Sequence, residues 1–210
     1  MAGDLADVEY VVHTMARTAT DNEKYFGDLD AVVGDGDFGY SLARGFEVVL
    51  SDWDGIDRSD ISTFLKKIAL TITSRIGGTS GPIWGTMFLR AAATVGDRSE
   101  VDGATLVAGL RAAAEGIMAR GKAELGDKTL LDALVPATDA LEQALRCGGD
   151  GARAFADTAR ERAEATEQLQ ARRGRASYTG ERSIGSVDAG AIAVAVLAEA
   201  IAAGWADRKS

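Results

Sequence analysis

Apolar side chains recur along most of the chain at steps of three and four residues, the spacing of one face of an α-helix. The stripes lie within residues 5–19, 42–50, 61–72, 106–117, 130–145 and 192–201. Pro82 can open a further helix through residues 83–93, because proline is tolerated in a first helical turn. Residues 152–173 are rich in alanine and charge and predict a more exposed helix. With no convincing alternating strand, the pattern predicts about eight helices with short connections, which is typical of an all-α bundle of antiparallel neighbours.

Length and composition narrow the class of protein. The 210 residues suit one domain, residues 1–210, with its own core. A net charge of -9 disfavours binding to nucleic acid phosphates. No apolar run reaches about 18 residues, and the N-terminus carries acids where a signal peptide would carry lysine or arginine. The single cysteine, Cys147, and single histidine, His13, exclude an internal disulfide and a histidine–cysteine zinc cluster. We therefore expect a cytoplasmic protein that binds neither nucleic acid nor a membrane.

Three aspartates lie close together between the first two helical stripes. Asp30, Asp35 and Asp37 fall within eight positions, and glycines flank the last two. Glycine lets the backbone take turns that other residues resist. Carboxylates packed this closely repel one another unless a cation lies between them, and oxygen ligands select magnesium or calcium over zinc. On local pattern alone, an aspartate-rich turn that caps the next helix remains the alternative.

Three further polar segments separate the helical stripes. Residues 77–82 (GGTSGP) expose backbone N–H groups beside the start of a helix, an arrangement that suits phosphate oxygens. Residues 120–130 and 174–185 are loops rich in glycine and charge, and an arginine in the second could close over a nucleotide. Each segment alone is also compatible with an ordinary turn or a solvated surface loop.

Taken together, the four segments resemble one family, the L subunits or equivalent C-terminal domains of dihydroxyacetone kinases. The matching stretches are GDGDFG at 34–39, GGTSGPIWG at 77–85, RGKA and GDKTL within 120–130, and GRASYTGERSIG at 174–185. Their order and spacing agree with the family over nearly the whole chain. The resemblance implies a barrel of eight antiparallel amphipathic helices with the nucleotide among the loops at one end.

The resemblance also implies site residues. Asp30, Asp35 and Asp37 would hold two Mg²⁺ ions against the phosphates of ADP or ATP. The implied nucleotide contacts are Phe38, Gly39, Tyr40, Ser41, Gly78, Thr79, Ser80, Gly121, Leu130, Arg175, Asp188, Ala189 and Gly190. Some members carry histidine and asparagine in place of Phe38 and Ser41, and proline is common in place of Ala189. The hydrogen bonds that the histidine and asparagine side chains make to the nucleotide in such members are therefore not expected unchanged in this chain.

In this family a separate K subunit holds the ketose, and the chain implies no catalytic side chain of its own. His13 lies outside every matched stretch, and we interpret it as structural. The sequence leaves two phosphoryl donors open: ATP that exchanges freely, or bound ADP recharged by an M subunit of the phosphotransferase system from phosphoenolpyruvate. It also leaves open the identity of the ketose and whether the chain forms a homodimer. A noncatalytic nucleotide sensor that regulates a partner protein is the alternative function.

Overall fold

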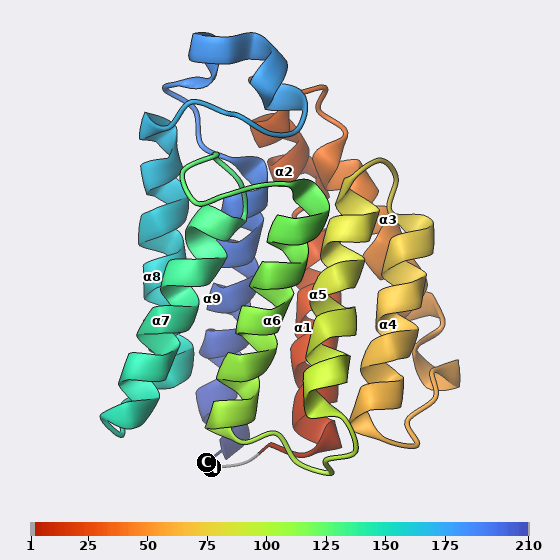
Figure 1. The fold of residues 1–210 in the computed structure, drawn as a ribbon. Helices are drawn as coiled ribbons and strands as arrows, with labels where there is room; N and C mark the ends of the chain where they lie inside the picture. The colour runs from red at the N-terminus through yellow and green to blue at the C-terminus, as the bar shows by residue number, and fades with distance from the viewer. Residues whose placement is uncertain (1–2, 210) are drawn as a thin grey trace.

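The computed structural model describes residues 3–209, in which nine α-helices are joined by loops and three short 3-10 segments (Figure 1). The helices are α1 (Leu5–Asp21), α2 (Glu23–Asp30), α3 (Phe38–Ser51), α4 (Ile61–Arg75), α5 (Ser80–Val95), α6 (Gly103–Gly121), α7 (Leu131–Arg146), α8 (Gly151–Ala165) and α9 (Ala189–Lys209). The 3-10 segments are η1 (Trp53–Gly55), η2 (Thr166–Gln168) and η3 (Arg175–Ser183).

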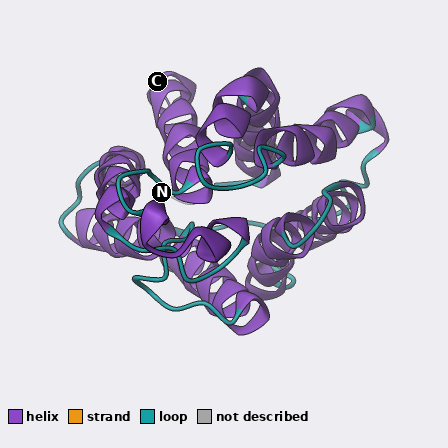
Figure 2. Cartoon of the chain, turned by 90° about the horizontal axis from the view of Figure 1, so that it is seen from above, coloured by secondary structure: helices purple, strands orange, loops and turns teal. Residues whose placement is uncertain are grey.

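Eight of these helices close into a ring. Each packs against the next in the order α1, α3, α4, α5, α6, α7, α8 and α9, and α9 returns to α1 (Figures 1 and 2). At the closing seam the Tyr10 hydroxyl donates to the Ile201 carbonyl oxygen at 3.3 Å. The short α2 packs on α3 and α9 at one end of the ring. This arrangement confirms the predicted all-α barrel of antiparallel helices.

Apolar side chains fill the interior of the ring. Phe26, Phe46, Phe64 and Trp84 are at most 1% exposed, and many alanines lie between the larger side chains. Alanine combines the highest helix propensity with a small side chain, so it favours close approach of neighbouring helices. Among the helices of residues 3–209, none combines the length and apolar character that a membrane span requires.

The prediction missed one helix and extended another too far. The segment 23–30 forms α2, which the periodicity missed because only Phe26 of its eight residues is buried. The helix predicted over residues 152–173 ends at Ala165. Beyond it, backbone donors bind partners outside the helix: the Ala171 N–H donates to Ser183 Oγ at 2.8 Å, and the Arg172 N–H to the Asp127 carbonyl oxygen at 3.0 Å. These tertiary bonds replace the helical ones, so the alanine-rich composition does not decide the backbone there.

Candidate functional site

The loops with unusual sequences all lie at one end of the ring. In a ring of antiparallel helices, every second connection returns to the same end. The connections 31–37, 76–79, 122–130 and 166–188 therefore share one end, which is the upper end in Figure 1. The connections 52–60, 96–102 and 147–150 lie at the other end. The helical order thus gathers four segments that are far apart in the sequence.

The three aspartates form a compact cluster at this end. Asp30 is the last residue of α2, and Asp37 is the N-cap of α3. One carboxylate oxygen of each of Asp30, Asp35 and Asp37 lies within 4.8 Å of the others. Glycines make this turn possible: Gly36 has φ +76°, and a Cβ on Gly34 would lie 2.2 Å from Asp30 Oδ1. The local sequence therefore brings the three carboxylates together.

The electrostatics of the cluster fit a cation-binding site. Partial desolvation, together with the nearby carboxylates of Asp35 and Asp30, raises the pKa of Asp37, and the Arg175 guanidinium acts in the opposite direction. Arg175 Nε lies 3.0 Å from Asp35 Oδ2. The Phe38 N–H donates to Asp30 Oδ2 at 3.4 Å. The guanidinium of Arg175, from the loop 166–188, thus neutralises part of the negative charge of the three carboxylates.

Helix starts differ between the two ends of the ring. At the far end, α1, α4, α6 and α8 each begin with an aspartate whose side chain accepts a backbone N–H: Asp4, Asp60, Asp102 and Asp150. At the near end, only α9 starts with a side-chain cap bond, from Asp188. The N-cap residues of α3, α5 and α7 make none: Asp37, Thr79 and Leu130. The first N–H groups of these helices carry the positive end of the helix dipole, and anions bind readily to such groups.

The glycine-rich turn before α5 is shaped by close backbone contacts. Gly78 has φ +62°, and a Cβ on Gly81 would lie 2.3 Å from the Ile76 carbonyl oxygen. Thr79 is exposed, and Ser80 is partly buried in the first turn of α5. A Cβ on Gly77 would lie 3.9 Å from Ser41 Oγ, so the turn lies beside the start of α3.

Gly121, Leu130 and the turn at 188–190 lie at the same end of the ring. A Cβ on Gly121 would lie 3.4 Å from Ile83 Cδ1, and a Cβ on Gly190 would lie 3.4 Å from Leu130 Cβ. Leu130 is 8% and Ala189 is 9% exposed. Gly121 at the end of α6 thus lies against α5, and Leu130 before α7 lies against the first turn of α9.

Asp188 begins α9 and lies within the electrostatic reach of the cluster. Its Oδ2 accepts the Ala191 N–H at 2.7 Å, which caps the helix. Burial raises the pKa of Asp188 to about 7, and the carboxylates of Asp132 and Asp30 raise it further. The hydrogen bond from Ala191 and the ammonium of Lys128 act in the opposite direction. The residue as a whole keeps partial exposure to solvent. The carboxylate is therefore set in a crowded acidic environment.

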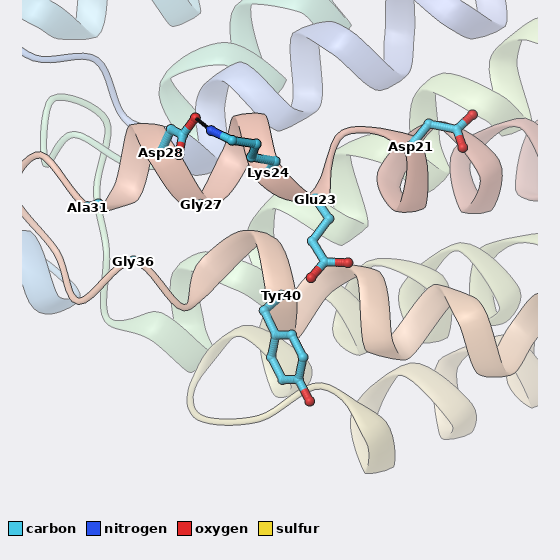
Figure 3. A pocket seen from close by; sticks show the side chains of 8 residues that line it. All are labelled: Asp21, Glu23, Lys24, Gly27, Asp28, Ala31, Gly36 and Tyr40. Carbon is cyan, nitrogen blue, oxygen red and sulfur yellow. Dashed lines mark hydrogen bonds and ion pairs between the residues drawn. The ribbon is translucent and has the colours of Figure 1, made fainter.

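Phe38 and Tyr40 lie on different sides of the start of α3. Phe38 packs against Phe26 with ring centroids 6.2 Å apart. Tyr40 is 56% exposed, and Arg44 lies over its ring at 5.1 Å. Tyr40 lines an open cavity of 570 Å³ along α2, where Lys24 and Asp28 pair with each other (Figure 3). The aspartates of the cluster do not line this cavity, so it is an adjoining hollow rather than the centre of the site.

The sequence prediction assigned no role to three polar residues that organise the loop 122–130. Asp132 Oδ1 and Oδ2 accept the N–H groups of Gly126 at 2.5 Å and Thr129 at 2.7 Å. Asp127 is 5% and Lys128 is 2% exposed. The motif GDKTL contains two of them, but the sequence pattern does not reveal that a lysine within it is buried.

Comparison with known proteins finds a matching family and relatives similar over most of the chain. The family model described as the DAK2 domain matches residues 32–203. The chain is 39% identical over 190 residues to the PEP-dependent dihydroxyacetone kinase, ADP-binding subunit DhaL, of Escherichia coli, which covers 88% of this chain and 89% of the relative. It is 37% identical to the L-erythrulose 1-kinase of Mycolicibacterium smegmatis over 91% of this chain and 34% of that relative.

The fold also resembles a solved structure with bound ligands. The dihydroxyacetone kinase from C. freundii in complex with AMP-PNP and Mg²⁺ superposes with a TM-score of 0.75 at 27% identity. The match covers 97% of this chain and 35% of that one, so the present chain corresponds to about a third of the larger protein. Because the family model matches most of its length, the chain belongs to the DAK2 domain family.

Proposed function

We propose that this chain is the nucleotide-carrying subunit of a dihydroxyacetone-type kinase, which presents a Mg²⁺-bound nucleotide to a ketose held on a separate K subunit. The observation that carries the proposal is the cluster of Asp30, Asp35 and Asp37, whose oxygens lie within 4.8 Å of one another beside helix starts without side-chain caps. Relatives similar over almost their full length are named ADP-binding subunits of such kinases.

The donor set fits magnesium. Three carboxylates supply hard oxygen ligands, and Mg²⁺ is usually held by a few carboxylates together with water and substrate phosphates. We propose two ions, shared between the cluster and the phosphates of ADP or ATP. When bound, they would neutralise charge on the phosphoryl group and orient it for transfer.

The predicted nucleotide contacts would bind the phosphates and the adenine. Gly78, Thr79 and Ser80 are suited to phosphate oxygens, since they lie at the start of α5. Phe38, Gly39, Tyr40 and Ser41 form the first turn of α3 next to the aspartates. Gly121 and Leu130 would line the adenine side, and Arg175 with the turn Asp188–Ala189–Gly190 would complete the site.

His13, the single histidine of the sequence, lies away from the proposed nucleotide site. His13 lies on α1, with its ring 4.9 Å from the ring of Trp53 in an edge-on contact, outside the nucleotide end. We propose that the K subunit supplies the group that holds the ketose. Large apolar side chains are exposed on the loops of the nucleotide end: Tyr178 at 84%, Val32 at 64% and Leu125 at 52%. These suit the docking of a K subunit, and we expect the complex to form in the cytoplasm.

Two experiments test the proposal. Purified protein is passed through gel filtration with magnesium, and the protein peak is analysed for ADP. The protein is then mixed with a K subunit and a ketose, with either ATP or phosphoenolpyruvate plus phosphotransferase proteins including an M subunit. Phosphorylated ketose is the expected product, and the donor that works identifies how the nucleotide is recharged. Nucleotide binding without transfer under both conditions would contradict the kinase function and point to a sensor.

A further inference from the structure

The most unusual polar group outside the aspartate cluster is the ammonium of Lys128. The residue is 2% exposed, although lysine is rarely buried to this degree. Its Nζ donates to three backbone carbonyl oxygens: Leu169 at 3.1 Å, Ser186 at 2.5 Å, and Ser183. An ammonium has three N–H donors, so all of them are used.

All three acceptors belong to one segment, the connection between α8 and α9. We call residues 166–188 the strap. It crosses the nucleotide end above α7 and α9 (Figure 1). The strap carries Arg175, which reaches Asp35, and it ends at Asp188, which begins α9. Two residues of the proposed nucleotide site therefore depend on where the strap lies.

The neighbouring residue makes a second tie to the same segment. Asp127 Oδ2 lies 3.1 Å from Arg173 Nε, and the Asp127 carbonyl oxygen accepts the Arg172 N–H at 3.0 Å. Asp127 and Lys128 are consecutive and both buried. The loop 122–130 and the strap are thus joined through two adjacent side chains and form one unit over the site.

The backbone at Lys128 argues that its side chain matters. Lys128 has φ +62°, a left-handed conformation that glycine adopts at no steric cost and that other residues resist. Burial lowers the pKa of Lys128, against the attraction of Asp188 and Glu167. A glycine here would avoid both costs, but it could not bridge to the strap.

We propose that Lys128 is a positioning residue, whose buried ammonium holds the strap over the nucleotide site and so keeps Arg175 and Asp188 in place and slows nucleotide release. The inference rests on the proposed function, because it concerns the same site. Lys128 itself need not touch the nucleotide. Its effect reaches the site through the three carbonyl groups that it binds.

The test compares nucleotide release with strap mobility. In Lys128→Met, the release of a fluorescent ADP analogue in the presence of Mg²⁺ should accelerate by on the order of tenfold, since three charge-assisted hydrogen bonds are lost. Hydrogen exchange should rise in the strap and remain unchanged in α4 and α5. Lys128→Gly should behave in the same way, although it relaxes the left-handed backbone. Wild-type release and strap exchange in Lys128→Gly would overturn the proposal.

Two controls separate positioning from general stability. Lys122→Met removes an exposed lysine of the same loop, which also has positive φ, and should leave strap exchange unchanged. Leu141→Ala makes a cavity in α7 towards the far end, where Leu141 is 5% exposed and lies near Gly151. It should lower the melting temperature without faster release. Equal acceleration in Leu141→Ala and Lys128→Met would mean that Lys128 serves only the fold.

A second variant covers failure of Lys128→Met and Lys128→Gly to fold. Asp127→Asn weakens the neighbouring tie without leaving carbonyl groups unpaired, and it should raise strap exchange and accelerate release by a smaller factor. Unchanged strap exchange would overturn the proposal. If the wild-type protein binds no ADP with Mg²⁺, the proposed function fails, while strap exchange in these variants still decides whether this loop holds the strap.

Discussion

Asp35 combines two roles in one exposed side chain, since it belongs to the carboxylate cluster and pairs with Arg175. Its side chain is 42% exposed, so its loss should cost the fold little. We expect Asp35→Asn to abolish transfer to the ketose in a complex reconstituted with a K subunit, because one of three anionic ligands for Mg²⁺ is lost. Circular dichroism should show the helices intact. Asp97→Asn, an exposed aspartate at the far end, should retain activity. Full activity of Asp35→Asn at ordinary magnesium would refute the assignment.

At the scale of single residues, some residues of the candidate site could be predicted from the sequence and others could not. The cluster was predictable because aspartates alternating with glycines are a visible pattern, and the structure does bring their oxygens together. Lys128 was not predictable in this way. Its burial depends on the strap, which lies about 40–60 positions further along the chain, and no local pattern distinguishes a buried lysine from a solvated one. Whether the predicted nucleotide contacts bind ADP stays a prediction.

At the scale of the helix, two glycines should respond oppositely to the same substitution. A Cβ on Gly85 in α5 would lie 1.9 Å from Thr73 Oγ1 and 3.0 Å from the Ala69 carbonyl oxygen of α4. Gly85→Ala should therefore destabilise the protein by about 1–3 kcal/mol. Gly109 in α6 has only ordinary contacts, the nearest at 3.8 Å from Ala91 Cα. Gly109→Ala should stabilise by about 0.5–1 kcal/mol, because alanine has the higher helix propensity. Urea unfolding measures both, and shifts of the same sign would contradict the packing.

The aspartate caps at the far end predict an acid response. Asp102 Oδ1 accepts the Thr105 N–H at 2.7 Å, and this bond lowers the pKa of Asp102 below 3.8. The folded state therefore holds the proton less tightly than the unfolded state. The stability that the charge contributes is present above the unfolded pKa and is lost as pH falls through the folded pKa. Asp102→Asn keeps an acceptor without titrating, so its melting temperature should fall less than that of the wild type between about pH 5 and pH 3. Parallel curves would show that the cap charge contributes nothing.

Periodicity predicted the long helices well, because each of them buries a continuous apolar stripe in the ring. It failed where the stripe was too short or where tertiary bonds replaced it. The helix α2 buries only Phe26, and residues 169–173 bind the loop 122–130 and Ser183 instead of continuing α8. Both errors lie at the end of the ring that carries the four connections of the proposed site, where the backbone forms loops instead of core helices.

At the scale of the whole molecule, the proposed site belongs to the ring as a whole. Its residues come from four connections that join α2 to α3, α4 to α5, α6 to α7 and α8 to α9. These connections meet only when the eight-membered ring is closed, including the seam between α1 and α9. A ligand that contacts all four should therefore bind the folded chain and have little affinity for the unfolded one.

This coupling makes nucleotide binding a test of global stability. A ligand at about 100 times its dissociation constant stabilises the folded state by about 2.7 kcal/mol, which for a chain of this size corresponds to roughly 5–10 °C in melting temperature. We expect ADP with Mg²⁺ to raise the melting temperature of the wild type by such an amount. Chelation of magnesium by EDTA should remove most of the increase, because the carboxylates of Asp30, Asp35 and Asp37 repel the phosphates when no cation separates them. Differential scanning calorimetry measures the shift, with Asp35→Asn as the variant that should not respond. An equal increase with ADP in the presence of EDTA would mean that the nucleotide binds without the cluster.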